Sequence, residues 1–221
     1  PSIGVVGSCW LHGTQVIGKG IPSEVSVLSG REAWNLLVAV EPNNAELGAP
    51  PTTQLYRSAA LKELDSWFRV GLFYDDVDLM VRLFTNRTFG YVHEVLSFVR
   101  VDNGGIFSTY HEFDIFEAER FFLTSVYQKT FGAESATNRI SAVWSERYYR
   151  RLAHAFLTVR GPAYWDFQRR AFEANGLTLR RGVLARALLS AVLDAALDPK
   201  SSIERLCRRR RGDNVALRTT K

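Results

Sequence analysis

The chain has 221 residues, of which 46% are hydrophobic, 12% aromatic and 23% charged, as in an ordinary globular protein. This composition excludes a disordered chain and a collagen-like repeat. Cys9 and Cys207 are the only cysteines, which excludes a disulfide scaffold and indicates a reducing compartment. Residues 1–138 carry 10 basic and 16 acidic side chains (net −6), whereas residues 139–221 carry 18 and 7 (net +11). The two parts of the chain therefore face different surroundings.

The N-terminal segment predicts strands followed by a helix. Residues 3–7 form an apolar run typical of a buried strand, and residues 10–17 alternate around Gly13 as a hairpin does. Ser29 and Glu32 have the spacing of a capping box, in which each side chain accepts a hydrogen bond from the other residue's backbone N–H. We expect a helix of about three turns to follow.

The alternation of strand and helix continues downstream. Residues 52–57 predict a strand, and we expect Ser58 to cap a short helix. A second helix is expected after residue 75, and residues 91–101 alternate as a strand does. From His111 onward the apolar spacing predicts helices almost throughout.

The basic C-terminal part ends in four consecutive arginines at residues 208–211. Such a run is either a solvated tail or a contact for an acidic surface, such as an anionic membrane, nucleic acid or the acidic half of the chain. No segment predicts a transmembrane helix. We expect a cytoplasmic location with peripheral contact to an anionic membrane, and no nucleic-acid partner.

Asp75, Asp76 and Asp78 occupy the first turn of the predicted second helix, where the helix dipole favours negative charge. A helix cap needs only one carboxylate, so three are an excess. The cluster is therefore either a set of capping residues or a site with acid or base chemistry.

Three segments follow one another in a fixed order. A small-residue loop over residues 48–52 precedes a strand that ends in Arg57, the pattern D-D-x-D-L-x-x-R-L covers residues 75–83, and F-G-Y-V-H-E-V-L-S-F-x-R covers residues 89–100. In this order the segments resemble the acceptor half of a bacterial family 2 glycosyltransferase of the GT-A type, over about residues 3–109.

The resemblance implies an inverting transfer from a nucleotide-sugar donor to a hydroxyl of a glycan, lipid-linked or other acceptor. Asp76 matches the general base, Asp78 its orienting or capping neighbour, and Asp75 the position where Glu is more usual. Asp76 and Asp78 can also be interpreted as the family's metal-binding D-x-D, but that motif should follow a strand and come before this region. We expect the true D-x-D in a nucleotide-binding part that precedes Pro1.

The resemblance also implies a donor site. Arg100 matches an arginine that pairs with the diphosphate, although a strand-end arginine is also often simply exposed. Relatives carry a His in the next loop, and this chain has Asp102 instead, so a Mg²⁺ or Mn²⁺ ion would draw on Asp102 or lose that ligand. Thr52 and Arg57 are expected to border the acceptor or donor pocket.

Four other side chains are weaker candidates. His93 lies in the matching strand and either faces the cleft or is a hydrogen-bonded structural residue. Trp10, Trp34 and Trp67 could stack on a sugar, but their apolar surroundings favour core packing.

The predicted fold is α/β: a partial GT-A, Rossmann-like mixed sheet with flanking helices over residues 1–110, then a helical basic extension over residues 111–221. The predicted function is that of a glycosyltransferase fragment, inactive alone, because transfer requires donor and acceptor to be held together. The alternative is a non-catalytic binding module that its Arg-rich C-terminus attaches to anionic membrane or nucleic acid.

Overall fold

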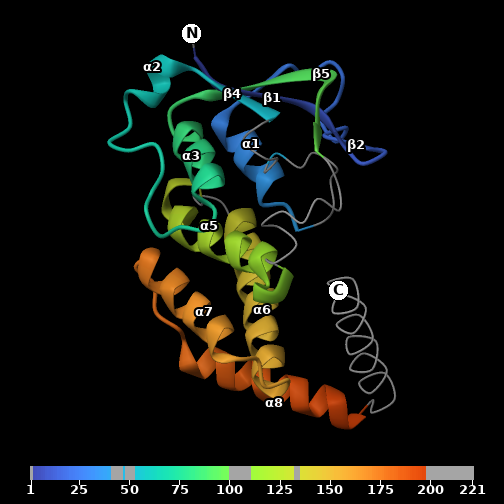
Figure 1. Ribbon diagram of the computed structural model, residues 1–221, viewed down its shortest axis with the longest axis vertical. Coiled ribbons are helices and arrows are strands. Elements are labelled where there is room, and N and C mark those ends of the chain that lie inside the picture. Colours follow the sequence, from blue (N-terminus) through green and yellow to red (C-terminus); the bar gives the residue numbers. More distant parts are fainter. Residues whose placement is uncertain (1, 41–46, 48–52, 100–110, 132–134, 198–221) are drawn as a thin grey trace, which may run out of the picture. The chain divides into compact units, whose positions relative to one another are not determined.

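The computed structural model describes residues 2–40, 47, 53–99, 111–131 and 135–197 (Figure 1). The chain divides into two compact units. The first comprises residues 1–148 and 161–178, and the second comprises residues 149–160 and 179–221. The expected boundary near residue 110 falls inside the first unit.

A curled mixed sheet organises the first unit, and its strands follow the order β2-β1-β5-β3. The long strands β1 and β5 pair in parallel, with Gly7 opposite Tyr91, whereas β2, β3 and β4 are short and pair antiparallel. The strands are β1 (Ile3–His12), β2 (Gln15–Ile17), β3 (Val27–Leu28), β4 (Gln54–Tyr56) and β5 (Thr88–Val99).

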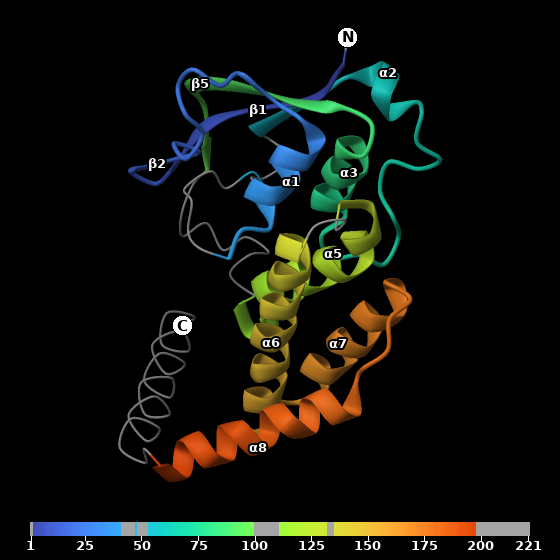
Figure 2. The same ribbon diagram turned by 180° about the vertical axis from the view of Figure 1, so that it is seen from behind.

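Two helices, α1 and α3, cover one face of this sheet (Figures 1 and 2). The Phe84 ring on α3 meets the Phe89 ring on β5 edge to face, with 5.8 Å between centroids. The helices are α1 (Gly30–Leu37), α2 (Ser58–Leu61), α3 (Asp75–Phe84), α5 (Ile115–Phe131), α6 (Ser135–Leu157), α7 (Pro162–Ala174) and α8 (Arg181–Leu197). The α/β class is confirmed. No helix in the described ranges is long and apolar enough to cross a membrane.

The helices that follow the sheet share its core. Trp34 on α1 is fully buried and stacks on Phe131 of α5, with ring centroids 4.8 Å apart. The Trp144 indole N–H of α6 donates to the Val38 carbonyl at 2.8 Å. Helix α5 and the first part of α6 therefore belong to the same unit as the sheet.

Predictions that rest on local interactions are largely confirmed. The hairpin at residues 10–17 forms as β1 and β2, and Ser29 and Glu32 make both hydrogen bonds of a capping box. The helix that follows has 8 residues, so it is shorter than three turns. The expected cap at Ser58 is wrong, because Arg57 holds the N-cap position of α2 without a side-chain cap bond and Ser58 is already helical.

Candidate active site

The cluster of three aspartates opens α3, as expected. Tyr74 is the N-cap and makes no side-chain cap bond, and Asp75, Asp76 and Asp78 lie in the first turn. Helix α3 ends at Phe84 and β5 begins only four residues later, so the C-terminal end of α3 lies next to the start of β5 (Figure 1). The aspartate cluster lies at the other end of the helix.

Asp78 has a structural position within this cluster. Its side chain is 1% exposed, and its carboxylate accepts hydrogen bonds from Arg69 Nε at 2.8 Å, Arg82 Nε at 3.0 Å and Tyr127 OH at 2.7 Å. These partners come from the preceding loop, from one turn further along α3 and from α5. Asp78 therefore joins three segments, which is more than the orienting or capping role expected from the sequence.

The same network fixes the loop that precedes α3. Arg82 Nη1 donates to the Ser66 carbonyl at 2.6 Å, and its Nη2 donates to the Trp67 carbonyl. Arg69 also donates to the Tyr127 hydroxyl. The start of α3 is consequently held from both sides, which gives the remaining two carboxylates a defined position.

Asp76 is half-buried, as is Asp75. Its Oδ1 accepts the Val77 N–H at 2.8 Å, and no basic side chain in the described ranges pairs with it. Burial raises the pKa of the Asp76 carboxyl, the negative charge of Asp75 raises it further, and the Val77 hydrogen bond partly offsets both. An unpaired carboxylate with a raised pKa is suited to accept a proton.

Two residues that the sequence did not single out lie within electrostatic reach of Asp76. Burial raises the pKa of the Tyr56 hydroxyl on β4, and the Asp76 charge adds to that rise. Burial likewise raises the pKa of Glu119 on α5, with Asp76 again contributing, while Arg120 opposes it from 3.0 Å. No sequence signal separates this tyrosine or this glutamate from others, because only the packing of β4, α3 and α5 brings them together.

Of the other expected pocket residues, only Arg57 lies in the described part of the chain. Arg57 is exposed and its Nε donates to the Ile3 carbonyl at 2.7 Å, so it links the start of α2 to the start of β1. Thr52, Arg100 and Asp102 lie outside the described residues. The expected diphosphate and metal contacts therefore have no described geometry.

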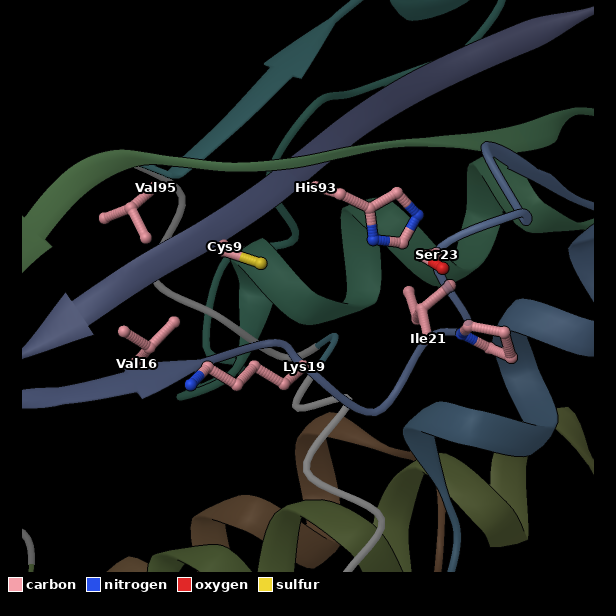
Figure 3. Close-up of a pocket in the computed structure, with 8 residues that line it drawn as sticks. Cys9, Val16, Lys19, Ile21, Ser23, His93 and Val95 are labelled. Atoms are coloured by element: carbon pink, nitrogen blue, oxygen red, sulfur yellow. The ribbon is translucent and has the colours of Figure 1, made fainter.

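His93 lines a separate pocket of about 440 Å³, between β5 and the loop that follows β2 (Figure 3). Its Nε2 donates to the Val25 carbonyl at 2.7 Å, a contact that fits the hydrogen-bonded structural alternative. Cys9, Lys19 and Ser23 also line this pocket. In the described part of the chain, His93 therefore contacts this loop and the Tyr91 ring on its own strand.

One turn of this loop depends on a glycine. Gly18 has φ +97°, and a Cβ there would lie 2.1 Å from the Tyr91 hydroxyl. That hydroxyl donates to the Gly18 carbonyl at 2.7 Å and contacts Cys9 Sγ at 3.3 Å. The loop therefore approaches the sheet too closely for any side chain at this position.

The tryptophans divide between core and surface. Trp10 and Trp34 are buried, so core packing accounts for both. Trp67 is 52% exposed, which is contrary to the expected core position. The structure brings these three indoles into no common platform.

The residues that the structure describes contain no group of three or more His, Cys, Asp and Glu side chains that could hold a metal ion.

Comparisons with protein-family models, with curated proteins and with solved structures gave no match.

Proposed function

We propose that this chain supplies the acceptor side and the general base of an inverting nucleotide-sugar glycosyltransferase of the GT-A type. The observation that carries the proposal is a difference in burial and ion pairing among the three aspartates at the start of α3. Asp78 is buried and forms ion pairs with Arg69 and Arg82. Asp76, two residues before it in the same turn, is half-buried, has no basic partner in the described part of the chain and has a raised pKa. The order of motifs over residues 48–100 supports the same assignment.

The proposed step moves one proton and exchanges one bond. The acceptor hydroxyl oxygen attacks the anomeric carbon of the donor sugar, and the bond from that carbon to the diphosphate breaks with inversion. The hydroxyl proton passes to the Asp76 carboxylate, and the nucleoside diphosphate leaves with the bonding electrons. The nucleotide-binding part of the enzyme holds the donor, and this chain aligns the acceptor against it.

The surroundings of Asp76 adjust its basicity. Partial burial and the Asp75 charge favour the protonated form, which makes the ionised carboxylate a better proton acceptor. The position of Asp76 at the start of α3 favours the ionised form instead, because the helix dipole and backbone N–H groups stabilise a carboxylate. Tyr56 and Glu119 lie close enough to Asp76 for its charge to raise their pKa values as well.

The test is an activity assay on the protein that joins this chain to its nucleotide-binding part. Nucleoside diphosphate release and sugar transfer are measured over a panel of nucleotide sugars, with Mg²⁺ or Mn²⁺ present. We expect Asp76→Asn to lower kcat by about 10²-fold or more while donor binding is retained. The matched control, Asp75→Asn, removes the same charge from the neighbouring residue and should retain transfer. Wild-type transfer by Asp76→Asn would contradict the assignment.

A further inference from the structure

Helix α8, in the second unit, carries an unusual amount of exposed apolar surface. Four of its side chains are about half or more exposed: Leu189 at 62%, Val192 at 49%, Leu193 at 51% and Leu197 at 84%. Its N-terminal end is tied to α6, because the Arg180 N–H donates to the Tyr149 hydroxyl at 2.8 Å. The exposed side chains therefore belong to an ordered helix and not to a loose end.

Most of the exposed apolar residues gather on one side of α8, and Val183 and Leu197 lie outside that side. At 3.6 residues per turn, one face contains Leu184, Ala187, Leu188 and Ala191, all half-buried. The opposite face is the α8 stripe, which contains Gly182, Ala185, Leu189, Val192, Leu193 and Ala196, all exposed. A helix that only packs on its own domain presents charged or polar residues on that outer face.

Basic residues border the α8 stripe. Arg181 and Arg186 are exposed and lie on its two sides on the helical wheel. The described part of the second unit carries six arginines against one acidic residue, Asp194: Arg150, Arg151, Arg160, Arg180, Arg181 and Arg186. In sequence, residues 198–221 add eight basic and three acidic side chains.

An apolar stripe between cations matches the interface of an anionic membrane. There, apolar side chains enter the acyl boundary while arginines contact the headgroups. A nucleic acid would match the arginines but would leave the leucines and valines in water. A second copy of this chain would cover the leucines, but it would bring the arginines of two basic units close together.

We propose that α8 is an interfacial helix that docks this protein on anionic membrane surfaces through the α8 stripe. The helix lies in the plane of the interface and does not cross the bilayer. Docking restricts the protein to a surface, and so to acceptors displayed there, but it holds whether or not the proposed transferase activity is found. The arginines at residues 208–211 add electrostatic attraction and do not replace the apolar contact.

The test is vesicle binding by the full chain. Vesicles of phosphatidylglycerol and phosphatidylcholine are compared with vesicles of phosphatidylcholine alone by co-sedimentation at low and high salt. We expect binding to the anionic vesicles only, weakened by salt. Each of Arg181→Gln and Arg186→Gln should lower the partition constant by roughly fivefold.

Matched variants on α8 separate the stripe from general charge effects. Leu189→Glu places a charge in the stripe and should lower the partition constant by more than about tenfold. Ser190→Glu places the same charge one residue away, outside the stripe, and should lower the partition constant by no more than about fivefold, because it adds one charge near the surface without removing apolar burial. If circular dichroism shows that Leu189→Glu unfolds α8, the helix-preserving pair Leu189→Ala and Leu193→Ala replaces it.

Four outcomes would overturn the proposal. One is equal binding by Leu189→Glu and wild type, and another is loss of all binding on changing only residues 208–211 to Gln, which would assign attachment to the tail. A third is binding of duplex DNA without binding of vesicles. The fourth is a dimer in sedimentation velocity that Leu189→Glu dissociates, together with no vesicle binding, which would assign the α8 stripe to a second copy.

Discussion

The replacement Asp78→Asn tests whether the buried ion-pair network holds the candidate site together. The amide keeps the size of the side chain but removes the charge that Arg69 and Arg82 face. Breaking a buried pair by neutralising one partner costs about 3–5 kcal/mol. Arg69 is 42% exposed and can be hydrated, so its contribution to the loss of unfolding free energy approaches the value for a surface ion pair, about 0–1 kcal/mol.

The larger share comes from Arg82, whose side chain is only 17% exposed. We therefore expect Asp78→Asn to lower the free energy of unfolding by about 3 kcal/mol, at the lower end of the buried-pair range. In a chain of this size that loss corresponds to a fall in Tm of about 6–12 °C. Thermal and urea unfolding followed by circular dichroism measure it.

Two further variants make this test specific. Asp75→Asn removes the same charge from the same turn without breaking an ion pair, so it should cost less than about 1 kcal/mol. Arg82→Met should reproduce most of the Asp78→Asn loss, and the double variant should lose less than the sum. If Asp78→Asn destabilises no more than Asp75→Asn, or if the two losses simply add, the network does not hold α3 to the preceding loop.

Three further predictions concern pH, a close backbone approach and a helix cap. Burial and the Asp75 charge raise the pKa of Asp76, and the base must be ionised, so the acidic limb of the pH profile of kcat/KM should lie above the usual aspartate range. Asp75→Asn should move this acidic limb to lower pH. An acidic limb that does not move would count against Asp76 as the base. A Cβ at residue 30 would lie 1.8 Å from the Phe84 carbonyl oxygen, so Gly30→Ala should lower stability by about 2 kcal/mol or more in urea unfolding, and a near-neutral change would exclude that packing. Ser29→Ala removes the capping box of α1 and should cost about 1 kcal/mol in the same assay, which an unchanged midpoint would contradict.

Local interactions explain what the sequence determined about this protein. The hairpin at residues 10–17, the capping box at Ser29 and the start of α3 at Asp75 all depend on residues within a few positions of one another. Hydrogen bonds and turn preferences at such short separations act before any tertiary contact forms. Hydrophobic periodicity is also read over short sequence separations, which is why the α/β class and the helical second half could be predicted.

The tertiary structure alone decided which of the three aspartates is structural. In the sequence Asp76 and Asp78 differ only in position, but Arg69, Arg82 and Tyr127 approach Asp78 from separations of 9, 4 and 49 residues. Long-range packing also placed His93 in a pocket that Asp76 does not line and left the α8 stripe exposed. Periodicity shows which side chains share a face of an element, but only the folded chain determines what that face contacts.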